Sequence, residues 1–165
     1  MAAKYKDLVS YFENLSRRHV EIGHNDAEQH FYRFELDEVI TGMCGEMNYP
    51  ALTLEGYDVN YRESESDNIR KARTGAFILI DEIGDSKDFN AIADGYDKLE
   101  QIGEDILIKM KADKESRQYP VLREFDITQC EGVPFAPPQK GQVAFRFTFN
   151  LVSAVNSEVD SEKWQ

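Results

Sequence analysis

The stretch Asp88–Asp113, DFNAIADGYDKLEQIGEDILIKMKAD, carries the clearest periodicity in the chain. Its apolar or small residues recur at alternating steps of three and four, which brings side chains to one face of an α-helix. These residues are Phe89, Ile92, Tyr96, Leu99, Gly103, Ile106 and Met110. Ser86 or Asp88 can cap the start. We therefore expect a long helix at about 88–113 that packs on a sheet through this stripe.

The other faces of this helix are acidic. Asp94, Asp97 and Glu104 lie off the apolar stripe, where they meet water or a partner. The whole chain has the same bias, with 19 Lys and Arg against 31 Asp and Glu and a net charge of −12. Direct binding of nucleic acid is not expected from this negative net charge, because contacts with phosphate need a basic patch.

The composition indicates one folded domain that does not depend on disulfide bonds. A chain of 165 residues with 41% hydrophobic residues can bury roughly 70% of its unfolded surface. Cys44 and Cys130 are the only cysteines and lack CxxC spacing, which favours synthesis in a reducing compartment. We see no export signal, and no apolar run approaches the ~18 residues that span a bilayer. A soluble protein without a membrane partner is expected.

Several further elements follow from hydrophobic spacing. An N-terminal helix is expected at about 4–17, where Tyr5, Leu8, Val9, Phe12 and Leu15 share a face. A short extended segment at 32–34 precedes a short helix near Glu35–Met43, which stops around Gly42–Gly45. Apolar or alternating runs predict the strands Pro50–Tyr57, Gly75–Ile83, Val121–Thr128 and Val143–Val152.

The last of these strands has two unlike sides. One side is strongly apolar and is formed by Val143, Phe145, Phe147, Phe149 and Leu151. Arg146, Thr148 and Asn150 point the other way, so we expect the opposite sheet face to be wet or covered by another subunit.

The expected fold class is α+β. Two hairpins give an antiparallel or mixed sheet of about four strands, covered by the long helix and the N-terminal helix. Residues 1–152 form this single domain, and the polar tail 153–165 is flexible or ordered by a partner.

The polar segment 58–74 forms an arm between two expected strands, and loops of this length in compact domains are usually functional or mobile. Its acidic part precedes its basic part: the residues are Glu63, Glu65 and Asp67, then Arg70, Lys71 and Arg73. The two legs can pair with each other, or acid to base with a neighbouring copy around a ring. A solvated loop of balanced charge explains the pattern equally well.

Two clusters raise the question of a metal site. His19, His24 and His30 lie close in sequence, but steps of five and six do not share a helix face, and solvated loop histidines are the favoured interpretation. Asp81, Glu82, Asp85 and Asp88 lack the spacing of an EF-hand loop. Helix capping and a solvated rim explain these carboxylates better, and a weak divalent site stays an alternative.

No motif predicts catalysis. The chain has no Walker-type phosphate loop, no dinucleotide fingerprint and no GxSxG elbow. Neither Cys44 nor Cys130 has a histidine beside it in sequence, and a small apolar filler is the expected role of each. We expect neither an enzyme nor a bound cofactor.

The order of elements resembles the tail-terminator and tail-completion proteins of tailed phages. An N-terminal helix, a strand opening with Pro50-Ala-Leu-Thr-Leu-Glu, a long arm, the strand Ala76–Ile83, the helix Asp88–Met110 and a closing aromatic strand carry this resemblance over most of residues 5–152. It rests on element order and hydrophobic pattern, without a diagnostic motif. The segment Ser16–Gln29 and the short helix after Phe34 have no counterpart in that pattern.

The resemblance implies a homo-hexameric ring in the virion, made in the bacterial host cytoplasm. Such a ring caps the tail tube, joins it to the neck or connector proteins and performs no catalysis. It also implies that acidic groups facing the lumen let DNA pass without specific binding. The alternative from the residues alone is an acidic monomeric binding or inhibitor protein, such as an immunity protein or a nucleic-acid mimic, that uses Asp94, Asp97 and Glu104.

Overall fold

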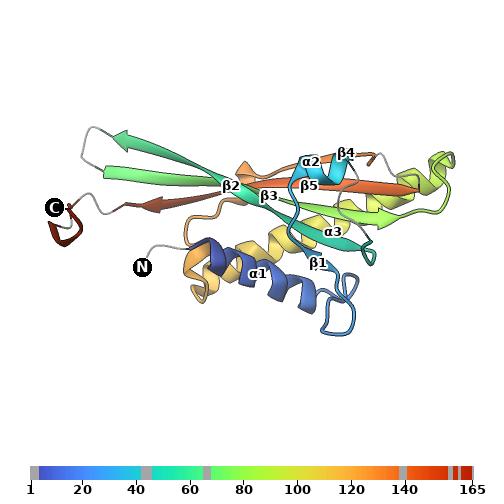
Figure 1. Ribbon diagram of the computed structural model, residues 1–165, viewed down its shortest axis with the longest axis horizontal. Coiled ribbons are helices and arrows are strands. Elements are labelled where there is room, and N and C mark those ends of the chain that lie inside the picture. Colours follow the sequence, from blue (N-terminus) through green and yellow to red (C-terminus); the bar gives the residue numbers. More distant parts are fainter. Residues whose placement is uncertain are drawn as a thin grey trace.

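A computed structural model describes residues 4–41, 46–64, 68–137, 141–155, 158–159 and 161–164, and Figure 1 shows its architecture. The fold class is α+β, as expected from the sequence. The helices are α1 (Tyr5–Arg18), α2 (Leu36–Thr41) and α3 (Phe89–Ser116), with 3-10 turns η1 (Pro120–Leu122), η2 (Ile127–Gln129) and η3 (Ser161–Lys163). The strands are β1 (Phe31–Tyr32), β2 (Ala51–Ser64), β3 (Asn68–Glu82), β4 (Glu131–Phe135) and β5 (Gln142–Ala154).

The described strands form one five-stranded sheet in the order β1-β2-β3-β5-β4. Two-residue β1 pairs in parallel with β2, and all other pairs are antiparallel. The middle strand β3 is buried on both faces from Gly75 to Asp81, which explains its continuous apolar run. The sheet is therefore mixed, and its fifth strand is the short β1.

Helices α1 and α3 cover one face of the sheet, where the main core lies. The aromatic side of β5 packs here as expected, and Phe12 of α1 stacks on Phe149 with ring centroids 5.4 Å apart. The helices are also joined directly, because the Tyr11 hydroxyl donates to the buried Asp113 carboxylate at 3.0 Å. Burial and this hydrogen bond raise the pKa of Tyr11 above its usual value.

Helix α3 matches the predicted long helix closely. Asp88 is its N-cap and accepts hydrogen bonds from Asn90 N and Ala91 N. Most of the predicted stripe is buried or half-buried, but Phe89 was wrongly included, because it lies in the first turn and is 85% exposed. Helix α3 packs on the core from Ile92 onward, and Gly95 is its first buried residue.

The opposite sheet face is partly covered by this chain itself, which corrects the expectation that it is wet or covered by another subunit. Val39 of α2 packs with Ala51, Ile78, Ile80 and Ala144 in a second core. Beside it, Arg146 Nε donates to the buried Glu55 carboxylate at 2.7 Å. Burial raises the pKa of Glu55, although Arg146 acts against this shift. The end predicted for the short helix, around Gly42–Gly45, lies outside the described residues.

The expected strand Val121–Thr128 is wrong. Pro120 begins η1, and the Asp126 side chain accepts from Thr128 N at the start of η2, so local turn hydrogen bonds take the place of strand pairing. Its β-bridge to the sheet, Phe125↔Leu151, is isolated, and the segment is otherwise held by Val121, Leu122 and Phe125 packing in the main core. The neighbour of β5 is instead β4, whose Pro134 is tolerated because β4 is an edge strand.

Candidate functional site

The 58–74 segment is a β-hairpin arm formed by the outer halves of β2 and β3. The strands stay paired from Tyr57↔Gly75 to Ser64↔Asn68, and the arm extends past the ends of α1 and α3 (Figure 1). Glu65 and Asp67 of the predicted interface lie outside the described residues. The predicted protruding arm is thus a regular β-hairpin, and β5 pairs with its β3 leg from Thr74↔Asn150 to Arg70↔Ala154, so the arm is three-stranded over most of its described length.

The register does not pair the acidic leg with the basic leg. Arg62 lies opposite Arg70, and Glu63 lies opposite Ile69. Lys71 lies opposite Tyr61, with its ammonium nitrogen 5.6 Å from the centre of the Tyr61 ring, as in a cation–π contact. The idea that the legs neutralise each other directly is therefore wrong for the described pairs.

Alternation along the strands gives the arm two different faces. The helix-side face carries Tyr57, Val59, Tyr61 and, near the tip, Glu63 on β2, and Ile69, Lys71 and Arg73 on β3. It continues the sheet side on which Phe149 and Leu151 pack in the main core. Val59 is 38% exposed and Tyr61 is 61% exposed. The alternation of Tyr57, Val59 and Tyr61 in the sequence already indicates an apolar face on this strand, whereas the charge pattern pointed only to Glu63, Glu65, Asp67, Arg70, Lys71 and Arg73.

Arg73 differs from the other cations of the arm. It is buried, its guanidinium lies 5.5 Å from the Tyr57 ring centre, and Nη1 donates to Ser153 Oγ at 3.4 Å. Tyr57 in turn meets Tyr5 of α1, with ring centroids 5.2 Å apart. These contacts fasten the base of the arm to the body, whereas Arg70 is exposed and Lys71 is half-buried.

The acidic face of α3, defined as Asp94, Asp97, Glu100 and Glu104, is exposed. Within the described part of the chain, none of these four carboxylates forms a salt bridge. Lys98, on the same helix, instead binds Asp81 of β3 at 2.6 Å. The helix therefore presents a run of uncompensated negative charge.

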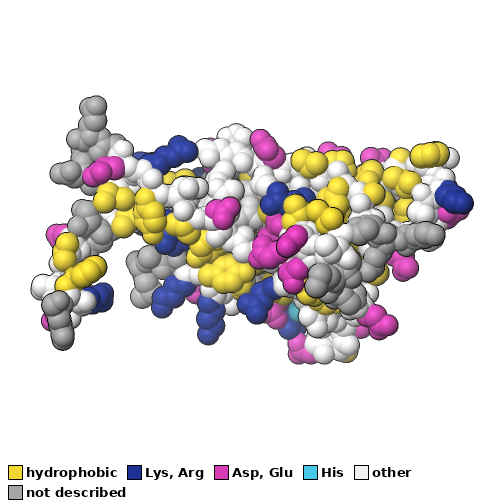
Figure 2. All heavy atoms as spheres, turned by 45° about the horizontal axis from the view of Figure 1, so that its top comes forward, with side chains coloured by type: hydrophobic (Ala, Val, Ile, Leu, Met, Phe, Trp, Pro, Cys, Tyr) yellow, Lys and Arg dark blue, Asp and Glu magenta, His cyan; other side chains and the backbone are white. Residues whose placement is uncertain are grey.

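Figure 2 shows how hydrophobic and charged side chains are distributed over one face of the molecule. Hydrophobic and basic side chains occupy much of the arm side of the molecule, while acidic side chains gather around the middle of the body. The arm, residues 58–74, has four Lys or Arg and four Asp or Glu, so the net charge of −12 belongs entirely to the rest of the chain.

The expectation of solvated loop histidines is wrong for His24 and His30, which are both 8% exposed. His30 N donates to His24 Nδ1 at 3.1 Å, so the His24 ring is the acceptor of this hydrogen bond. His24 Nε2 then faces Glu13 Oε1 at 3.7 Å, and His30 Nδ1 lies 3.0 Å from Pro50 O. These histidines hold the loop after α1 against the body.

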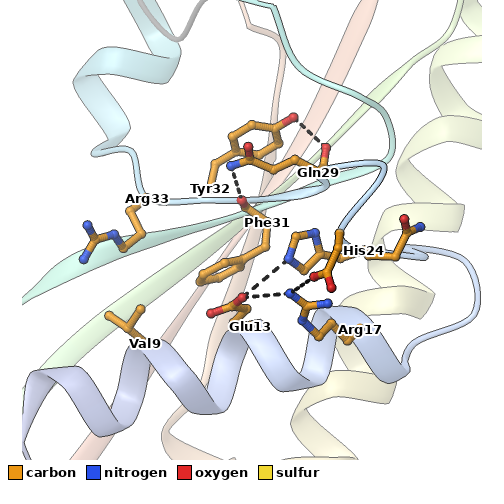
Figure 3. A pocket seen from close by; sticks show the side chains of 10 residues that line it. Val9, Glu13, Arg17, His24, Gln29, Phe31, Tyr32 and Arg33 are labelled. Atoms are coloured by element: carbon orange, nitrogen blue, oxygen red, sulfur yellow. Dashed lines mark hydrogen bonds and ion pairs between the residues drawn. The ribbon is translucent and has the colours of Figure 1, made fainter.

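A cavity of about 450 Å³ opens beside this loop (Figure 3). Val9 and Phe31 supply apolar lining, and Arg17 pairs with both Glu13 and Asp26 at 3.2 and 2.8 Å. Figure 3 shows Glu13, Arg17 and His24 pointing toward one another. Glu13, Arg17 and Asp26 satisfy each other, which leaves Arg33 as the one lining cation without an ion pair to a described residue.

The acidic cluster after β3 serves local structure. Asp88 caps α3, Asp85 accepts from Lys87 N at 2.9 Å, and Asp81 binds Lys98. Among the described residues, no three potential ligands come together to hold a metal ion. Capping, favoured from the sequence, is confirmed for Asp88.

Cys130 is half-buried, and burial raises its pKa to about 11, which suits a packing residue more than a nucleophile. Cys44 lies outside the described residues. None of the helices in the described part of the chain combines the length and apolar character needed to cross a bilayer.

The fold and these surfaces define an α+β domain with a protruding two-faced arm and an acidic helix. No protein-family model matches the chain, and no curated protein matches it.

Proposed function

We propose that this protein is a structural ring subunit of a phage or phage-like tail, most closely a tail terminator that caps the tail tube and joins it to the neck. The observation that carries the proposal is the arm. It extends past the ends of α1 and α3 and carries the exposed apolar side chains Val59 and Tyr61 on one face, and exposed apolar surface of this kind marks a contact with another protein. Such a feature is well suited to reach a neighbouring subunit.

The distribution of charge supports the same role. An arm of zero formal charge approaches a strongly acidic body with little long-range repulsion. Arm and body are different surfaces of one chain, so their contact is heterologous and generates either a closed ring or a filament. Acidic groups on the lumen side of a ring would let DNA slide without binding, and the role is structural, not catalytic.

The decisive experiment measures the mass of the purified protein in solution. Mass photometry and sedimentation velocity should detect a closed oligomer, for which the expected stoichiometry is six, and electron microscopy should show rings on the ends of tail tubes. A protein that stays monomeric at high micromolar concentration, and that never joins tube or neck proteins, would overturn the proposal.

The acidic face of α3 favours one alternative, a monomeric binding or inhibitor protein that mimics nucleic acid. Four exposed carboxylates without salt bridges to described residues resemble a row of phosphates. This alternative requires a monomer that binds a basic protein one to one. Binding should then be lost in Asp94→Asn, Asp97→Asn and Glu104→Gln combined, whereas a ring subunit keeps its partners through the arm.

A further inference from the structure

The helix-side face of the arm is an uncovered extension of the main core. Along β2 it passes from the buried Leu54 through the half-buried Tyr57 to the exposed Val59 and Tyr61. On the neighbouring strands Ile69 and Val155 are half-buried, and Val155 N donates to Ile69 O at 2.9 Å. Helices α1 and α3 cover the inner part of this face but end before its outer part (Figure 1).

The opposite face of the arm differs in chemistry. It carries Asp58, Asn60 and Arg62 on β2 and Arg70, Ala72 and Thr74 on β3, so it is mostly polar, and its apolar side chains, Ala72 and the neighbouring Val152 of β5, are half-buried. Thr74 donates across the sheet to Asn150 Oδ1 at 2.7 Å. If both faces of the arm were exposed to water, both would be expected to be polar. An apolar face opposite a polar face indicates that the apolar side is covered in the assembled state.

The charges on the helix-side face of the arm indicate which surface covers it. On this face Lys71 lies against Tyr61, Arg73 is buried at the base and Glu63 lies near the tip, so Lys71 is the cation beside the exposed apolar side chains. The acidic face of α3 is the complementary surface, because its four carboxylates have no salt bridge within the described chain and repel one another at helical spacings of three and four. The exposed Ile108, at 51%, gives the same helix an apolar contact further along.

We propose that the helix-side face of the arm, Val59, Tyr61, Ile69 and Lys71, packs on the acidic face of α3 of a second copy of this chain. The proposal rests on the proposed function and names the two surfaces that form the ring contact. Tyr61 and Val59 supply the buried apolar area, and Lys71 lies near Asp97 and Glu104 of the neighbour. The contact covers the outer part of the sheet with a helix, as α3 covers the inner part within its own chain.

The first test removes the apolar anchors. V59S/Y61S should raise the dissociation constant of the oligomer roughly tenfold or more, because buried aromatic residues carry a large share of contact energy. Asn60→Ser, on the opposite face of the same strand, is the matched control and should assemble as wild type does. Thermal melting keeps loss of folding distinct from loss of assembly, since both positions are exposed in the single chain.

The second test exchanges charges across the contact. Lys71→Glu and D97K/E104K should each weaken assembly, and the combined variant should recover much of the wild-type mass, because every contact then has reversed but complementary charges. Mixing the Lys71→Glu protein with the D97K/E104K protein should also give oligomers of alternating subunits.

The outcomes separate the two proposals. If wild type forms rings but V59S/Y61S assembles equally well, or the combined charge variant is no better than its parents, the named surfaces are wrong and the ring stands. If wild type is monomeric and joins neither tube nor neck proteins, both proposals fail. If wild type is monomeric and V59S/Y61S loses binding to a different tail protein, the arm docks on that protein and not on a second copy.

Discussion

At the scale of single residues, Gly103 determines how closely α3 approaches the sheet. A Cβ atom at this position would lie 2.0 Å from Cζ of Phe147, far inside van der Waals contact. The glycine lies on the predicted stripe because its missing side chain makes room for an aromatic ring. This reason cannot be read from hydrophobic spacing, which shows only that the position faces inward.

Gly103→Ala tests that packing. Alanine adds helix propensity of about 1 kcal/mol, but forcing a methyl group into a filled core typically costs about 1–3 kcal/mol. Because the added Cβ would lie only 2.0 Å from Phe147, the upper end of this cost applies, and we expect a net loss of about 2 kcal/mol in the free energy of unfolding by denaturant melts. Glu100→Ala, on the exposed side of the same helix, should change it by less than about 0.5 kcal/mol. A Gly103→Ala variant as stable as wild type would show that Phe147 moves aside without cost.

Cys130 gives a prediction about reactivity. With a pKa of about 11 instead of the usual 9.0, its thiolate should be roughly a hundredfold scarcer at pH 8 than that of a free cysteine. In a Cys44→Ser background, iodoacetamide should therefore modify the folded protein roughly a hundredfold more slowly than the protein unfolded in urea. Equal rates in the two states would mean that Cys130 is neither desolvated nor protected.

At the scale of elements, the N-cap residue Asp88 sets the start of α3. The sequence left Ser86 and Asp88 as possible caps, and the structure selects Asp88, whose Oδ1 accepts from Asn90 N at 2.9 Å and Ala91 N at 3.2 Å. Asp88→Ala should lower the free energy of unfolding by about 1 kcal/mol, while Ser86→Ala should have little effect. Asp88→Asn keeps the acceptor and should retain most of the stability. Equal losses at positions 86 and 88 would contradict this assignment.

The elements that sequence predicts well are those whose periodicity is long. Helices α1 and α3 and strand β5 each repeat one spacing over several turns or pairs, and β3 is marked by a long continuous apolar run, so chance matches are few. The strand expected at 121–128 failed because Phe125 and Ile127 alternate over only two positions, while Pro120 and Asp126 favour turns. Strand β4 was missed because Pro134 argues against a strand in the sequence. An edge strand is also defined more by its pairing with a neighbouring strand than by a hydrophobic pattern of its own.

The candidate surfaces, too, were predicted where local geometry determines them and missed where pairing with other elements does. Exposure of Asp94, Asp97 and Glu104 followed from helical geometry alone, and the structure agrees. The arm was recognised as a protrusion, but its cation Arg73 proved to be buried against Tyr57. Which side of a ribbon continues the core depends on register with β5, and register is a tertiary property that charge counts do not contain.

At the scale of the whole molecule, the same charges act in opposite directions on folding and on assembly. A net charge of −12 repels itself within one subunit, so added salt should stabilise the fold by screening. The proposed contact between Lys71 and the acidic face of α3 is attractive, so screening should weaken it. The Debye length falls from about 30 Å at 0.01 M to about 8 Å at 0.15 M salt, and both effects should therefore appear in that range.

We expect the melting temperature of V59S/Y61S, which reports on the separate subunit, to rise with NaCl over this range. The wild-type oligomer should instead dissociate more readily as NaCl increases, as measured by mass photometry on matched samples. Oligomerisation that strengthens with salt would indicate that apolar contact alone holds the subunits together. The arm would then remain a docking element, but Lys71 and the carboxylates of α3 would not select its partner.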